Sequence, residues 1–72
     1  MAKQENLKLE GKVVDVMPSA TFRVEVEGMD KLIVATISGK MRKHNIKVML
    51  GDWVEVEVSV YDLLRGRIVR RR

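Results

Sequence analysis

Lysine and arginine side chains are concentrated in one connecting segment of this 72-residue chain and in its C-terminal part. Residues 39–52 contain four Lys or Arg and one Asp, a net charge of +3, and residues 53–72 contain five cations and three acids, a net charge of +2. Residues 1–38 carry −1, from five cations and six acids. Such a basic excess is typical of a protein that binds a polyanion. The main candidate contacts are Lys40, Arg42, Lys43, Lys47, Arg65 and Arg67, and the additional candidates are Arg23, His44, Arg70 and Arg71.

The small number of aromatic residues indicates which kind of polyanion to expect. Only Phe22, Trp53 and Tyr61 are present, and proteins that bind single strands without sequence preference stack bases on several aromatic side chains. Phe22 shares the alternation of its apolar neighbours and is therefore expected in the core. The composition favours a protein that contacts the backbone and shape of structured RNA. The alternative is a general RNA-binding chaperone of the cold-shock type.

Two apolar residues near the cations have competing interpretations. Met41, isolated among basic residues, is either an anchor of the segment to the core or an apolar wedge, and the anchor is favoured. Trp53 lies on the polar side of its strand together with Glu55 and Glu57, so it is either a partly exposed contact or a packing residue. A protein-binding module that uses a strand edge or the Trp53 face is a further alternative.

Residues for catalysis or metal binding are scarce. The acids alternate with valines along expected strand surfaces, and the serines have no histidine base other than His44, which lies among cations. The glycine spacing before Lys40 does not form a phosphate-binding P-loop. The chain has no cysteine and one histidine, so neither a disulfide framework nor a multi-histidine site is available. We therefore expect a binding protein that is not an enzyme and needs no cofactor or metal.

The elements that must position the cations are predominantly strands. Apolar and polar residues alternate along 21–27 and 53–60, and less strictly along 7–17, where Val13 and Val14 break the alternation near Gly11 and indicate a bulge or a tight bend. The stretch 31–38 is apolar at both parities, as in a strand covered on both faces, and 67–70 predicts a short fifth strand. Turns are expected at 18–20, 28–30 and 61–66. A helix over Lys40–Lys47, with Ser38 as its N-cap, would place Lys40, Lys43, His44 and Lys47 on one face.

Five strands with one helical insert between the third and the fourth predict an all-β oligonucleotide-binding (OB-fold) barrel. A five-stranded SH3-like barrel is the rival fold, although it normally lacks this insert. We expect a single domain over 1–72, with flexible ends at about 1–6 and 70–72. There is no apolar run of about 18–20 residues and no signal peptide pattern, which predicts a soluble intracellular protein without a membrane partner.

Several motifs, taken together, are specific to one family. These are Phe22-Arg23-Val24, Ile37-Ser38-Gly39-Lys40-Met41-Arg42-Lys43, Gly51-Asp52, and Tyr61-Asp62-Leu63 followed by Arg65-Gly66-Arg67-Ile68. They closely resemble bacterial translation initiation factor 1 over nearly the whole chain.

The resemblance implies an S1-type OB-fold protein, monomeric, in the cytoplasm or, if plastid-encoded, in the plastid stroma. It further implies binding to the small (30S) ribosomal subunit at the A (decoding) site through 16S rRNA, with a decoding-site ribosomal protein nearby. The family is expected to occlude the A site and to cooperate with initiation factors 2 and 3.

Site residues carry over from the family position by position. Lys40, Met41, Arg42 and Lys43 match the RNA-contacting loop of the family, and Arg65 and Arg67 match the basic residues of its last hairpin. Lys47 stands where arginine is usual, so it offers a point charge without the planar fork of a guanidinium. Three further departures are Asn45 and Arg70, where an aromatic is common, and Val60, where proline is common.

Overall fold

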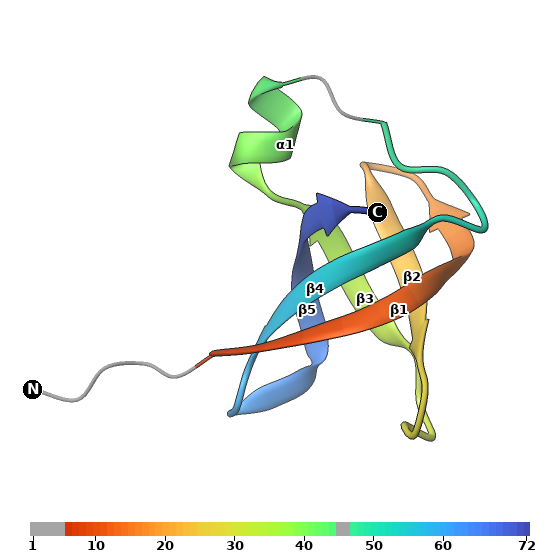
Figure 1. Cartoon of the computed structure of the whole chain (residues 1–72), viewed down its shortest axis with the longest axis vertical. Coiled ribbons are helices and arrows are strands. Elements are labelled where there is room, and N and C mark those ends of the chain that lie inside the picture. The colour runs from red at the N-terminus through yellow and green to blue at the C-terminus, as the bar shows by residue number, and fades with distance from the viewer. Residues whose placement is uncertain (1–5, 45–46) are drawn as a thin grey trace, which may run out of the picture.

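The computed structural model describes residues 6–44 and 47–72, and these form one small barrel with a single-turn helix at one end (Figure 1). The expected helix therefore extends into residues outside this description, and the family departure at Asn45 lies there. The flexible end expected at about 1–6 also lies there, except for Asn6, which begins the first strand. The elements are β1 (Asn6–Met17), β2 (Thr21–Val26), β3 (Ile33–Ile37), α1 (Gly39–Lys43), β4 (Trp53–Ser59) and β5 (Asp62–Arg71).

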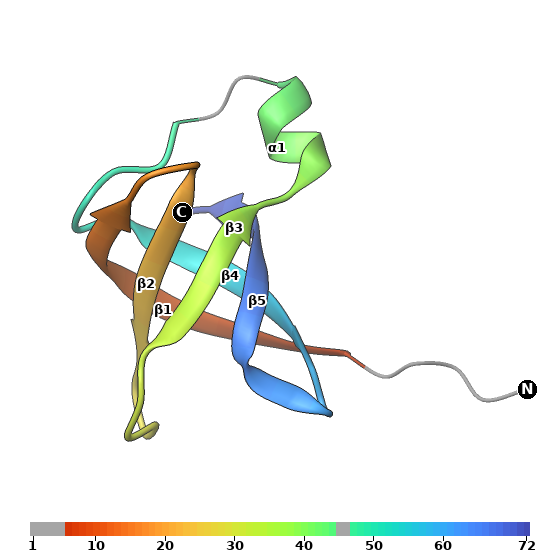
Figure 2. The ribbon, with the colours of Figure 1, turned by 180° about the vertical axis from the view of Figure 1, so that it is seen from behind.

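The five strands close on one another in the order β1-β2-β3-β5-β4. Pairing is antiparallel except between β3 and β5, which run parallel from the pair Val34 and Arg65 to the pair Ile37 and Ile68. Seen from behind, β2, β3 and β5 lie side by side, and α1 continues from the end of β3 (Figure 2). A closed five-stranded barrel with one short helix between β3 and β4 is the predicted OB-fold architecture, and the SH3-like alternative is not supported.

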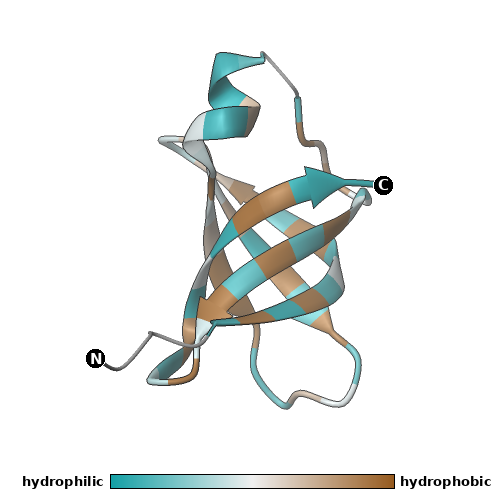
Figure 3. Cartoon of the chain, turned by 60° about the vertical axis from the view of Figure 1, so that its left-hand side comes forward, coloured by the Kyte–Doolittle hydropathy of each residue, from teal (hydrophilic) through white to brown (hydrophobic). Residues whose placement is uncertain are grey.

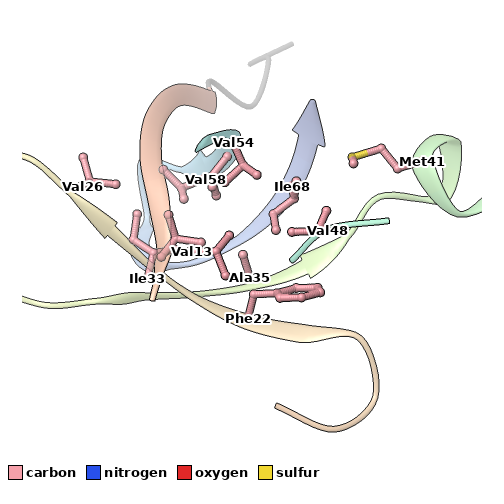
Figure 4. Packing of buried hydrophobic residues seen from close by; sticks show 12 residues of the cluster. Val13, Phe22, Val26, Ile33, Ala35, Met41, Val48, Val54, Val58 and Ile68 are labelled. Atoms are coloured by element: carbon pink, nitrogen blue, oxygen red, sulfur yellow. The ribbon is translucent and has the colours of Figure 1, made fainter. Parts of the chain in front are cut away.

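Alternating hydropathy determines which side chains fill the barrel. Apolar and polar residues alternate along the ribbon in Figure 3, and the inward set forms one continuous core (Figure 4). Phe22 is buried in this core, as its parity predicted. The buried apolar residues are Val13, Phe22, Val24, Val26, Ile33, Ala35, Met41, Val48, Val54, Val56, Val58 and Ile68.

Three expected elements differ from those observed. In β3, Ile33 and Ala35 are buried but Val34 is exposed, so the prediction of a strand covered on both faces was wrong. The fifth strand runs over Asp62–Arg71 rather than 67–70, because pairing with β4 extends almost to the hairpin tip. The helix is shorter than predicted and ends at Lys43.

Two other expectations concern strand irregularity and the C-terminal end. The predicted bulge in β1 is confirmed by a register shift between Val13 and Asp15. Residues 70–72 were expected to form a flexible end, and in the structure they are hydrogen-bonded. Arg70 and Arg71 belong to β5, and the backbone N–H of Arg72 donates to the carbonyl of Trp53 at 2.8 Å. Their mobility in solution stays a prediction.

Candidate nucleic-acid interface

Helix α1 begins at the N-cap that the sequence predicted. The Ser38 hydroxyl accepts a hydrogen bond of 3.2 Å from the backbone N–H of Met41, which satisfies a donor that a helix start leaves without a partner. The backbone N–H of Ser38 in turn donates to the carbonyl of Ile68 at 3.0 Å. The start of the helix is therefore tied directly to β5, which carries the other group of candidate cations.

Met41 is the apolar anchor of this helix. Its side chain is 2% exposed and points from α1 toward Val48 and Ile68 at the end of the core (Figure 4). Of the two interpretations left open by the sequence, the structure shows the anchor. In this conformation the Met41 side chain presents almost no surface to a ligand, and its contact with RNA stays a prediction.

Burial of Met41 turns the other side chains of α1 outward. Lys40, Arg42, Lys43 and the C-cap His44 are all exposed. Within residues 6–44 and 47–72, none of the three Lys and Arg cations of α1 lies within ion-pair distance of a carboxylate. Lys47 is exposed as well, but it lies beyond the helix, so the predicted face shared by Lys40 and Lys47 is not formed as a helical face.

The parallel pairing of β3 with β5 places arginines from distant parts of the chain in one row. Val34 of β3 is the register partner of Arg23 on β2 and of Arg65 on β5, and Thr36 is the partner of Arg67. Register partners point to the same side of a sheet, so Arg23, Arg65 and Arg67 share the outer surface of β2, β3 and β5. Helix α1 follows β3 at one end of this surface (Figure 2). We call the cations of α1 together with Arg65 and Arg67 the basic surface.

Some of the candidate cations are already engaged by acids. A terminal nitrogen of Arg67 donates to Glu57 at 3.3 Å, and Arg23 lies 3.5 Å from Asp15. The hydrogen bonds from Asn6 and Arg67 lower the pKa of the Glu57 carboxyl, which keeps it ionised. Arg65 has no carboxylate within ion-pair distance among the described residues. Phosphates would therefore find Arg65 and the cations of α1 more readily available than Arg23 or Arg67.

The two additional candidates at the C-terminus have different surroundings. The guanidinium of Arg71 donates to the carbonyl of Lys47 at 2.9 Å and lies 4.0 Å from Asp52, so it holds the segment that follows α1. Arg70 is the register partner of Glu55 on β4, away from β3. The structure does not bring Arg70 into the basic surface.

The surface offers charge and shape rather than reactive groups. In the described part of the chain, no three His, Asp or Glu side chains are arranged to hold a metal ion. No helix there has the length and hydropathy needed to cross a bilayer. Exposed ammonium and guanidinium groups on a rigid barrel can neutralise and position phosphates.

Comparison with known proteins identifies the family. The family model described as translation initiation factor 1A / IF-1 matches residues 1–72. The chain belongs to this family. The resemblance seen in the sequence motifs is thereby confirmed.

Two solved structures are similar to this chain. The solution structure of translation initiation factor 1 from the Wolbachia endosymbiont strain TRS of Brugia malayi has 39% sequence identity and a TM-score of 0.77, and the match covers 93% of this chain and 78% of that one. The crystal structure of YjeQ from Thermotoga maritima has 31% identity and a TM-score of 0.70. That match covers 92% of this chain but only 23% of YjeQ. The match to the Wolbachia factor, with the barrel itself, confirms the predicted OB-fold.

Sequence reasoning missed two features of the interface that depend on contacts between distant parts of the chain. The first is that Val34 and Thr36 lie between the arginine positions on the outer surface. Both residues are uncharged, so no charge pattern marks them as part of the interface. The hydrogen bond from Arg71 to Lys47 joins residues that are 24 positions apart. Neither relationship leaves a periodic signal in the chain.

Proposed function

We propose that this member of the initiation factor 1 family binds the small (30S) ribosomal subunit at the A (decoding) site through 16S rRNA and occludes that site during initiation. The observation that carries the proposal is the basic surface, where Arg65 on the outer side of β5 and the cations of α1, beyond the end of the β3–β5 pairing, have no acid partners among the described residues. Family membership supports the choice of the ribosome as the polyanion. The protein acts by binding and exclusion, with no chemical step, and works beside initiation factors 2 and 3.

The proposed contacts with RNA phosphates differ in whether each cation already has an acid partner in the protein. Lys40, Arg42, Lys43 and Arg65 bind phosphates directly, and Lys47 extends this set. Arg67 contributes to the positive electrostatic potential of the surface while it stays paired with Glu57. Arg23 and His44 lie at the borders of the surface. The protein acts as a monomer and is located with the ribosomes, in the cytoplasm or in a plastid stroma. When bound, it lies beside a decoding-site ribosomal protein.

The decisive experiment measures small-subunit affinity as a function of salt. The triple variant Lys40→Ala, Arg42→Ala and Lys43→Ala should lose most of its affinity, and each lost phosphate contact should reduce the slope of log K against log salt by about 0.7–0.9. A charge-matched control is Lys8→Ala, Lys12→Ala and Lys31→Ala, which removes three exposed cations from other parts of the molecule. Equal loss of affinity in both triple variants would contradict the proposed surface.

Site and cooperation need separate measurements. Chemical footprinting of 16S rRNA should show protection confined to the decoding region, and the protein should block transfer RNA from the A site. Subunit affinity should rise when initiation factors 2 and 3 are present. The RNA-chaperone alternative predicts instead that poly-uridine binds as tightly as the small subunit, and the half-exposed Trp53 is the feature of the barrel that favours it.

A further inference from the structure

A concave region of the molecule lies away from the basic surface, on the outer side of β1, β2 and β4. It is a pocket of about 380 Å³, lined by Trp53, Met29, Val26, Lys12, Glu25 and Glu27. Met29 packs against the core from the loop that follows β2, and Trp53 is the first residue of β4. The pocket therefore combines an apolar floor with a charged rim.

The strand register explains why an indole ring stands in this place. Lys12 of β1 is the partner of Glu25 on β2 and of Trp53 on β4, so these three side chains form one row across the outer surface. Trp53 is 52% exposed, an unusual state for the only tryptophan of so small a chain. The exposed face of a tryptophan ring attracts cations through its quadrupole.

The acids on the rim are not used by the protein itself. The ion pairs found within residues 6–44 and 47–72 engage Asp15, Glu57, Asp52 and Glu10. Glu25 and Glu27 are exposed and lie outside ion-pair distance of any cation in these ranges, including Lys12 beside them. In a chain with a formal charge of +4, two such carboxylates beside an exposed indole form a local site for positive charge.

We propose that this pocket docks a basic segment of a partner protein. One arginine or lysine of that segment lies against the Trp53 ring, with its head group between Glu25 and Glu27 and an apolar neighbour on Met29. Nucleic acid is disfavoured as the occupant, because two carboxylates repel phosphates. An added β-strand is disfavoured as well, since β1, β2 and β4 each have both neighbours in the closed barrel.

Trp53 provides the measurement, because its emission reports only on this pocket. The probe is a synthetic ten-residue peptide of alternating arginine and alanine, titrated into the full chain. We expect a saturable change in Trp53 emission, and none with the matched glutamate–alanine peptide. The double variant Glu25→Gln and Glu27→Gln should weaken binding roughly fivefold, as expected for the loss of two exposed charge pairs.

Two further variants separate a specific pocket from general attraction to acids. Lys12→Gln removes a competing positive charge and should strengthen binding about twofold. Asp62→Asn removes an acid from the β4–β5 hairpin, far from the pocket in the sheet, and should leave affinity unchanged. In calorimetry, Trp53→Leu should weaken binding about threefold, within the range of an exposed cation–π contact.

The result that overturns the proposal is equally specific. If Asp62→Asn weakens the arginine peptide as much as the pocket variants, or if Lys12→Gln also weakens it, the binding is diffuse attraction. If the glutamate–alanine peptide binds with the same affinity as the arginine–alanine peptide, Glu25 and Glu27 do not select for positive charge. The triple variant of Lys40, Arg42 and Lys43 should keep its peptide affinity, so failure of the ribosomal proposal and failure of this one are distinguishable.

Discussion

The guanidinium of Arg71 donates a hydrogen bond of 2.9 Å to the backbone carbonyl of Lys47, and this bond joins the end of β5 to the segment that follows α1. Around it, the Asp52 carboxylate accepts from the N–H of Met49 at 2.8 Å, and the N–H of Gly51 donates to the carbonyl of Val13 at 2.8 Å. The segment 47–52 is therefore held to two strands by several bonds. Arg71 therefore has a structural role, and its contact with RNA stays a prediction.

Replacing Arg71 tests that role. Arg71→Ala should lower the free energy of unfolding by about 0.5–1 kcal/mol, the range of an exposed hydrogen bond, and should accelerate amide exchange at Met49 and Gly51. Arg70→Ala removes the same charge from the neighbouring position beside Glu55 and is the matched control. Identical exchange rates in the two variants would mean that charge alone, and not the bond to Lys47, matters.

Glycine at position 66 is required by close packing of β5 on β4. A Cβ atom at Gly66 would lie 2.6 Å from side-chain carbons of both Val56 and Val58, and 2.9 Å from the carbonyl oxygen of Glu57. Gly66→Ala should therefore cost about 1–3 kcal/mol of stability in denaturant unfolding, as overpacking does. Gly39→Ala is the control, because a Cβ there meets nothing within 4 Å. It lies in α1 and should be neutral or stabilising by up to about 1 kcal/mol.

Met41 should respond to substitution as a core residue. Met41→Ala should destabilise the protein by about 2–5 kcal/mol, because it empties a fully buried site. Met41→Leu keeps the volume and should cost less than about 1.5 kcal/mol. If Met41 only anchors α1, the leucine variant should bind small subunits with unchanged affinity. A large loss of affinity in that folded variant would instead indicate direct contact with RNA.

The Glu57 carboxyl predicts a stability change at acidic pH. Its pKa is lowered from 4.5 by hydrogen bonds from Asn6 and then from Arg67. A folded-state pKa below the unfolded value means that the stabilisation is fully present above about pH 4.5 and is lost as pH falls through the folded pKa. Thermal unfolding of Glu57→Gln should therefore vary less with pH on the acid side than that of the unmodified chain.

Substitutions of the residues around Glu57 test which of them lowers the pKa of its carboxyl most. Asn6→Ala and Arg67→Ala should each raise the Glu57 pKa in a carboxyl-resonance titration. Lys8→Ala should raise it least, since Lys8 acts only through charge and is the smallest contributor. A larger effect from Lys8 than from Asn6 would show that long-range charge, rather than hydrogen bonding, keeps this carboxylate ionised.

Local patterns in the chain were sufficient to predict five strands and to locate the cations of α1, but not the length of β5 or the exposure of Val34. Alternation predicted that Phe22 and the valines of β4 point inward, because a strand with one buried face must place every second side chain in the core. The N-cap role of Ser38 and the bulge in β1 were also readable from neighbouring residues. Charge counting located the cations of α1 without any knowledge of the barrel.

Pairing between distant strands decided which side chains lie next to one another on the surface. Alternation assigns each side chain to a face of its strand, but it does not say which strand lies alongside. Only the parallel pairing of β3 with β5 brings Arg65 beside Val34, and the same pairing brings Ile68 to the start of α1. Only the antiparallel rows of β1 bring Trp53 and Glu25 to either side of Lys12. Alternation along the chain predicted which side chains of β2 and β4 face water. Closure of the barrel decided which of these side chains share a surface, because a shared surface depends on long-range register and packing.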